Sequence, residues 1–159
     1  MKVAAAFDHR GVKLRDAVLG AIERADGEPV DLGVDTAAEP VDYPDVAQTL
    51  GMALRRGDAE RGVLVCGSGV GASVAASKIP GIRAAVCHDT YSAHQGVEHD
   101  DMNVLCLGSE IVGAELAREL VRAFLAARFD GGERFVRRLN KVRDLERMVE
   151  GAVETAPTQ

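Results

Sequence analysis

The chain has 159 residues, a formal charge of −6, 47% hydrophobic residues and only 4% aromatic residues. This length indicates a single domain, and the apolar content excludes a disordered chain, a collagen-like chain and a small disulfide scaffold. The acidic balance argues against a general nucleic-acid binder, because such proteins are usually basic.

Nothing in the sequence indicates export or membrane insertion. The three cysteines are an odd number without CxxC spacing, which favours a reducing compartment. The opening residues, MKVAAAFDHRG, lack the apolar run of a signal peptide, and no apolar stretch approaches the ~18 residues of a membrane span. We therefore expect a soluble cytoplasmic protein with neither a membrane nor a nucleic acid as partner.

The N-terminal half alternates short aliphatic runs with helical patterns. In chain order it predicts a strand over residues 2–7, a helix over 12–25, a strand over 29–32, an acidic loop over 34–42, a helix over 45–56 and a strand over 62–65. Pro44 suits the first turn of the second helix, because its missing N–H is not needed there.

The C-terminal half continues the alternation. It predicts a helix over 69–77, a strand over 83–87, a helix over 90–98, a strand over 103–107, a long helix containing Leu116, Leu120 and Phe124, and a basic amphipathic helix over 133–150. We expect one domain over residues 1–150 and a flexible tail over 151–159, which has little to hold it in place.

Strands that alternate with helices indicate an α/β fold with a parallel sheet and helices on both faces. We expect a Rossmann or flavodoxin-like three-layer sandwich of five parallel strands with a C-terminal helix, and the strand order 2-1-3-4-5. In this order the first and third strands are neighbours, and ligands bind outside the carboxyl ends of strands at such a switch point.

Three glycines, Gly67, Gly69 and Gly71, fall within five residues between the third strand and the next helix. Glycines let backbone N–H groups approach a ligand, and a helix N-terminus favours an anion. Gly67-x-Gly69-x-x-Ala72 also matches a loose dinucleotide fingerprint, although it follows the third strand and no Walker lysine follows it. The alternative is a tight turn that binds nothing.

Cys66 directly precedes this loop. The N-terminus of a helix favours a thiolate, so Cys66 is a candidate base or nucleophile. The alternative is a small buried residue at a strand end, which is how we interpret Cys87 and Cys106 because they lie in or beside aliphatic runs.

Asp8 and His9 end the first strand, beside the proposed crevice. Such a pair can bind hydroxyls, move protons or hold a phosphate. Asp8 can equally cap the helix that follows.

His99 lies at a helix end just before the fifth strand, which places it at the sheet edge opposite Cys66. A functional His99 would therefore serve the site of a neighbouring subunit; the alternative is a cation at a helix C-terminus. His88, Asp89 and His94 lack the spacing of a zinc motif, so we expect no metal.

Arg134 and Arg138 are four residues apart on the last helix and share one face. Paired arginines can hold one phosphate, whereas the alternative is a solvated basic surface.

Together these residues resemble the type B ribose-5-phosphate isomerases and the related galactose-6-phosphate isomerase subunits. The resemblance spans about residues 2–145 and rests on this ordered set: Asp8-His9-x-Gly11, Asp31-x-Gly33, Asp42-Tyr43-Pro44-Asp45, Cys66-Gly67-Ser68-Gly69-Val70-Gly71, Gly81-Ile82-Arg83-Ala84-Ala85, Tyr91-Ser92-Ala93, Glu98-His99, Asn103-Val104-Leu105, and Gly131-Gly132 with Arg134 and Arg137-Arg138.

The resemblance implies an isomerase that interconverts ribose 5-phosphate and ribulose 5-phosphate through an enediolate, without metal or cofactor. It also implies a homodimer, or a tetramer of paired dimers, whose subunits share their sites. The implied roles are a base at Cys66, an anion hole from Ser68 and the amides of Gly67, Gly69, Val70 and Gly71, ring opening by His99, sugar hydroxyls on Asp8, and phosphate on His9, Arg134 and Arg138.

Three positions depart from the family pattern. Asp100, which would face the sugar, stands where asparagine is usual, Glu110 stands where arginine is common, and Glu133 adds a residue before Arg134. The first two leave open another sugar phosphate of four to six carbons. Two further hypotheses are a nucleotide-binding module that uses the loop 67–71 and a catalytically dead subunit of a paired enzyme.

Overall fold

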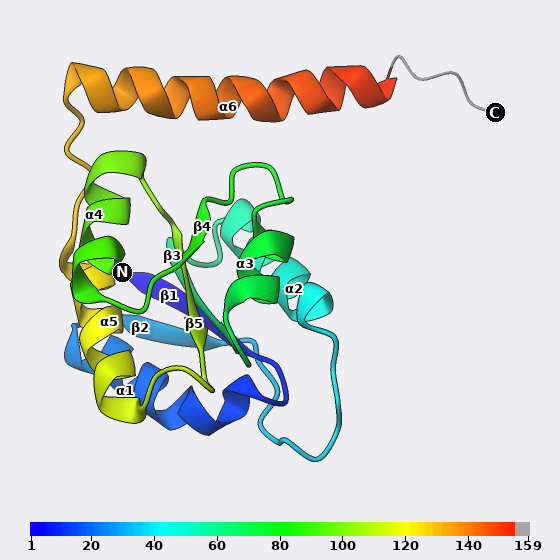
Figure 1. The fold of residues 1–159 in the computed structure, drawn as a ribbon, viewed down its shortest axis with the longest axis vertical. Coiled ribbons are helices and arrows are strands. Elements are labelled where there is room, and N and C mark those ends of the chain that lie inside the picture. The colour runs from blue at the N-terminus through cyan, green and yellow to red at the C-terminus, as the bar shows by residue number, and fades with distance from the viewer. Residues whose placement is uncertain (155–159) are drawn as a thin grey trace.

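Five parallel strands form one sheet with helices on both faces, which confirms the expected fold class (Figure 1). The computed structural model describes the backbone of residues 1–154 and the side chains of residues 1–148. The strands are β1 (Lys2–Phe7), β2 (Glu28–Asp31), β3 (Arg61–Cys66), β4 (Ala84–Val86) and β5 (Val104–Gly108). The helices are η1 (Gly11–Leu14, a 3₁₀ turn), α1 (Arg15–Arg24), α2 (Tyr43–Arg56), α3 (Val70–Ala76), α4 (Thr90–Asp100), α5 (Ala114–Ala126) and α6 (Glu133–Glu154).

The strand order is β2-β1-β3-β5-β4, so the expected order 2-1-3-4-5 is wrong for the last two strands. All five residues of β5 are buried, whereas the three residues of β4 are only half-buried. An interior strand is covered by helices on both faces, which agrees with the full burial of β5, whereas an edge strand such as β4 stays partly exposed. The neighbouring positions of β1 and β3 are confirmed, with Phe7 paired to Val65.

Alternate residues of the strands pack into two separate cores. On one face Phe7, Val65 and Leu107 pack with the buried sides of α1, α4 and α5. On the other face Leu64 and Cys106 pack with α2 and α3. Side chains of successive strand residues point to opposite faces, so the aliphatic runs that read as continuous in the sequence divide into these two layers.

The segment after β1 approaches β3 too closely for any residue but glycine. A Cβ at Gly11 would lie 2.1 Å from the carbonyl oxygen of Val65. The expected helix over 12–25 therefore begins as the 3₁₀ turn η1, and regular α-helix follows from Arg15. This close approach holds the loop after β1 against the end of β3.

Helix α6 passes along the end of the molecule beyond α4, near where β5 begins (Figure 1). Its buried residues are Phe135 and Leu139, whereas Val142, Leu145 and Met148 are exposed. The helix runs to Glu154, four residues past the expected end at 150, and the rest of the expected tail, 155–159, lies outside the described residues. Within the described chain, no helix has the length and apolar content to cross a membrane.

Candidate active site

The carboxyl ends of β1 and β3 open into a pocket of about 340 Å³. Because Phe7 and Val65 are paired in these parallel strands, Asp8 and Cys66 follow at the same edge of the sheet. The pocket is lined by residues from three segments, namely Asp8, His9, Arg10, Val41, Asp42, Tyr43, Cys66, Gly67, Ser68 and Gly71. The structure thus brings Asp8 and His9, which follow β1, together with the glycine loop that follows β3.

Asp8 is buried at the base of this pocket and also organises the loop after β1. Its Oδ1 accepts hydrogen bonds from the backbone N–H groups of Arg10 (2.9 Å) and Gly11 (2.7 Å). Asp8 therefore closes the turn that precedes η1, whose N-cap residue is Arg10, rather than serving as the N-cap of the helix itself. Both of these hydrogen bonds are made by Oδ1, so Oδ2 is the oxygen that remains for a ligand.

His9 is oriented by the loop that precedes α2. Its Nδ1 lies 3.2 Å from both the amide nitrogen and the carbonyl oxygen of Val41. Because Nδ1 is engaged by the backbone, Nε2 is the ring nitrogen available to a ligand.

The glycine loop turns sharply at Gly69, which has a φ of +80° and precedes the first residue of α3. A Cβ at Gly69 would lie 3.0 Å from the backbone nitrogen of Gly108, so this position requires glycine for conformation and for space. Gly69 donates its N–H to Sγ of Cys66 at 3.2 Å. The Ser68 hydroxyl, which is exposed, accepts from the N–H of Val70 at 3.3 Å.

The three cysteines are free, but their surroundings differ. Sγ of Cys66 accepts a backbone N–H and the residue lines the pocket. Burial raises the pKa of Cys87 to about 11, and it raises the pKa of Cys106 as well. Because the thiolate is the reactive form, Cys87 and Cys106 remain inert thiols at neutral pH.

We predict that iodoacetamide at pH 8 modifies Cys66 and leaves Cys87 and Cys106 unmodified in the folded protein. The raised pKa of Cys87 means that its thiolate appears only as the pH approaches about 11. Peptide mapping by mass spectrometry measures the three sites separately, and the unfolded protein is the control in which all three react. Equal labelling of Cys66 and Cys87 in the folded state would contradict the prediction.

The other expected site residues form a second group, at the opposite end of the sheet. The ring of His99 stacks on Phe135, with centroids 4.4 Å apart, and its Nδ1 lies 2.6 Å from Nε2 of Gln95. The guanidinium of Arg134 lies 4.4 Å from the centroid of the same Phe135 ring. His99 lies in the last turn of α4 and Arg134 in the first turn of α6, so both lie at the far end of the molecule from the loops that follow β1 and β3 (Figure 1). Asp100 and Arg138 are exposed in the same region.

Sequence reasoning missed several residues of the pocket. Arg10 was an unassigned position inside the Asp8-His9-x-Gly11 segment, and Val41 and Tyr43 belong to a loop and a helix start. A Cβ at Gly71 would lie 2.8 Å from Cζ of Tyr43, so this ring covers the glycine loop. The signal that pointed to Tyr43 was the Asp42-Tyr43-Pro44-Asp45 segment of the resemblance.

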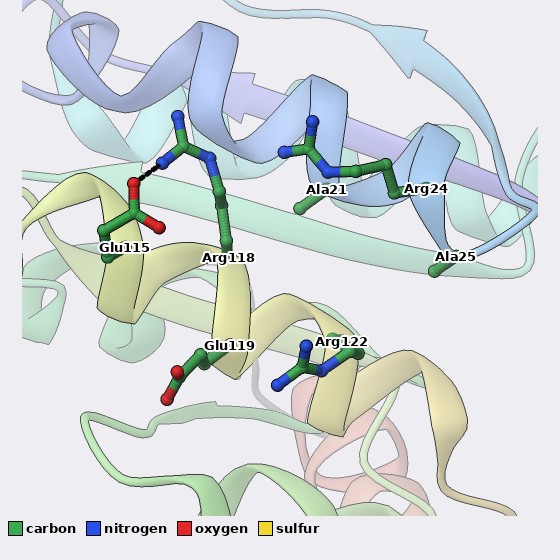
Figure 2. A pocket seen from close by; sticks show the side chains of 7 residues that line it. All are labelled: Ala21, Arg24, Ala25, Glu115, Arg118, Glu119 and Arg122. Atoms are coloured by element: carbon green, nitrogen blue, oxygen red, sulfur yellow. Dashed lines mark hydrogen bonds and ion pairs between the residues drawn. The ribbon is translucent and has the colours of Figure 1, made fainter.

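A separate pocket of about 380 Å³ lies on the outer surface between α1 and α5 (Figure 2). Arg24 reaches it from α1, and Glu115, Arg118, Glu119 and Arg122 reach it from α5. Arg118 is paired with Glu115. None of the residues expected to carry chemistry lines this pocket.

The family model described as Ribose/Galactose Isomerase matches residues 3–142. The Bacillus subtilis protein YwlF is 41% identical over 146 residues, which cover 92% of this chain and 97% of that protein. A D-erythrulose-4-phosphate isomerase of Pectobacterium atrosepticum is 38% identical over 83% of this chain and 87% of its own. Ribose-5-phosphate isomerase B of Escherichia coli is 41% identical over 82% of this chain and 87% of its own.

Solved structures agree with these relatives. A ribose-5-phosphate isomerase B from Clostridium thermocellum superimposes with a TM-score of 0.89 at 39% identity, covering 94% of this chain and 99% of that one. The Mycoplasma genitalium enzyme with bound ribulose-5-phosphate has a TM-score of 0.85 at 34% identity, covering 92% and 96%. The chain therefore belongs to the ribose/galactose isomerase family and is a sugar-phosphate isomerase.

Proposed function

We propose that the protein interconverts ribose 5-phosphate and ribulose 5-phosphate through an enediolate, with Cys66 as the base. The observation that carries this proposal is the pocket at the ends of β1 and β3, where the Cys66 sulfur, the Asp8 carboxylate and the glycine loop meet. Relatives named for this reaction support the choice of substrate, as does the related structure with bound ribulose-5-phosphate.

The proposed chemistry moves one proton between adjacent carbons of the open-chain sugar. The Cys66 thiolate removes the proton from C2 of the aldose. The electron pair of that C–H bond forms the C1–C2 double bond while the carbonyl electrons move to O1, which gives the enediolate. The proton of the C2 hydroxyl passes to O1, and the thiol returns its proton to C1 as the C2 carbonyl forms, which yields the ketose with no net change in atoms. A base placed beside the reacting carbon accelerates such a step by roughly 10²–10⁴-fold.

The loop 67–71 would stabilise the negative charge that develops on the enediolate oxygens. The N–H of Gly69 donates to the Cys66 sulfur, and the exposed Ser68 hydroxyl, which accepts from the N–H of Val70, lines the same pocket. Preorganised donors of this kind contribute roughly 3–4 kcal/mol each to an oxyanionic transition state. In the same proposal Asp8 binds sugar hydroxyls and His9 contacts the phosphate.

We also propose a homodimer in which His99, Asp100, Arg134 and Arg138 complete the site of the other subunit. Within one chain these residues lie at the opposite end of the sheet from Cys66, so they reach the pocket only from a second copy (Figure 1). Exposed apolar side chains support such an association, namely Val70 and Val74 on α3 and Val142, Leu145 and Met148 on α6. An apolar cavity of about 480 Å³ beneath α6, lined in part by Val142 and Leu145, belongs to the same surface.

Three free cysteines support a cytoplasmic location.

A substrate panel tests the choice of sugar. Purified protein assayed with aldose phosphates of four, five and six carbons should turn over ribose 5-phosphate with the highest kcat/KM, and EDTA should leave that rate unchanged. A preference for a four-carbon substrate would favour the activity named for the Pectobacterium relative and would remove the five-carbon assignment.

A thermal-shift screen with NAD and ATP is the control for the nucleotide-binding hypothesis, and stabilisation by nucleotides alone would contradict the isomerase assignment. Turnover by the isolated protein would exclude a catalytically dead subunit.

A further inference from the structure

Arg10 stands at the mouth of the pocket and covers the residue that follows Cys66. A Cβ at Gly67 would lie 2.8 Å from Cζ of Arg10, 2.9 Å from its Nε and 3.0 Å from its Nη1. The guanidinium therefore lies against the start of the glycine loop. Among the residues that line the pocket, Arg10 is the one with a permanent positive charge, whereas Asp8 and Asp42 contribute carboxylates.

The backbone of Arg10 is held rigidly relative to Cys66. Its N–H donates to Oδ1 of Asp8 at 2.9 Å, and its carbonyl accepts from the hydroxyl of Ser109 at 2.8 Å. Ser109 is buried, and its own N–H donates to the carbonyl of Cys66 at 2.9 Å. The turn after β5 thus joins the loop that carries Arg10 to the loop that carries the cysteine.

The ion pair of Arg10 with Glu110 is long, at 3.8 Å, and leaves the Arg10 side chain largely accessible to a ligand. Oε1 of Glu110 lies 2.8 Å from Nζ of Lys13 but 3.8 Å from Nη2 of Arg10. The hydrogen bond and charge of Lys13, and to a lesser extent the charge of Arg10, lower the pKa of Glu110, so the carboxylate stays ionised at neutral pH. The distances make the lysine its nearer partner. The Arg10 side chain remains 58% exposed, so its N–H donors can contact a bound anion.

We propose that Arg10 binds the phosphate group of the substrate, supplied by the same chain as Cys66. A dianionic substrate in a pocket lined by two carboxylates needs a cation there, and a guanidinium binds a phosphate through two parallel N–H···O hydrogen bonds. This inference rests on the proposed function, because it takes a sugar phosphate as the ligand. Each site would then take one phosphate-binding arginine from the chain that supplies Cys66, in addition to Arg134 and Arg138 from the second subunit.

The test compares Arg10→Ala and Arg10→Lys with Arg24→Ala, which changes an exposed arginine in the pocket between α1 and α5 (Figure 2). We expect Arg10→Ala to raise both KM for ribose 5-phosphate and the inhibition constant of inorganic phosphate by about tenfold or more, with kcat within about threefold of wild type. Arg10→Lys should fall between, because lysine keeps the charge and loses the paired donors. Arg24→Ala should match wild type in all three quantities.

Two results would overturn the assignment. One is Arg10→Ala with an unchanged inhibition constant for inorganic phosphate, which would show that the Arg10 side chain does not bind the phosphate group. The other is a fall in kcat alone, which would make Arg10 a positioning residue for the glycine loop.

Thermal stabilisation of each variant by inorganic phosphate is measured in parallel and does not depend on turnover. If wild type failed to isomerise ribose 5-phosphate, the proposed function would fail, while phosphate stabilisation would still report whether Arg10 binds the anion. Melting temperatures without phosphate show whether each variant is folded.

Discussion

Cys66→Ala is expected to lower kcat for ribose 5-phosphate isomerisation by about 10³-fold, because it removes the base that moves the proton between C1 and C2. Inorganic phosphate should still bind with nearly its wild-type affinity, since Asp8, His9 and the glycine loop remain in place. The variant should also fail to exchange solvent deuterium into the C2 position of the substrate. The assay combines steady-state kinetics with NMR detection of that exchange.

Cys87→Ala is the matched control for this experiment. Cys87 is also a free, buried cysteine, but it does not line the pocket. We expect its kcat to stay within about threefold of wild type, because it supplies no group to the proton transfer. If Cys66→Ala kept more than a tenth of the wild-type kcat, or still exchanged deuterium at C2, another group would have to be the base.

A mixture of two inactive variants is expected to regain activity. We expect Cys66→Ala and His99→Ala each to lose most activity, the latter by roughly 10²-fold if His99 opens the sugar ring. If each site combines Cys66 of one subunit with His99 of the other, a heterodimer of the two variants has one intact site. After unfolding and refolding a 1:1 mixture, random pairing should restore about a quarter of the wild-type activity.

The double variant Cys66→Ala/His99→Ala mixed with wild type is the control. In shared sites every heterodimer is inactive, so an equal mixture should retain about a quarter of the activity of the same total amount of wild type. Sites contained within one chain would instead retain about half, and the two single variants would then show no recovery on mixing. That pair of results would contradict the shared site and would require His99, which stacks on Phe135, to have a structural role.

The fold class was predictable because each element carries its own local pattern. Alternating aliphatic runs and helical periodicity depend on neighbours in the sequence, so five strands and their connecting helices could be located within a few residues. The order of the last two strands was not predictable in the same way. It depends on which of β4 and β5 buries more side chain between two helical layers, and the two strands compete for one position beside β3.

The site was predictable where topology alone brings residues together. Asp8 and Cys66 follow paired strands, so their meeting follows from a parallel sheet in which β1 and β3 are neighbours. His99 was placed at the opposite end by the same rule, since it precedes a strand where Cys66 follows one.

The class of fold, the edge of the sheet where the glycine loop lies and the likeness to one family of isomerases could all be predicted from the amino-acid sequence. The contact of Arg10 with Gly67, the orientation of His9 by Val41 and the link that Ser109 makes between the two loops of the pocket became visible only in the folded chain. The two groups of features differ in the range of the interactions that produce them. Periodicity and strand ends are local properties of the chain, whereas the hydrogen bond from Ser109 to Arg10 joins residues 99 positions apart and exists only once the sheet has formed.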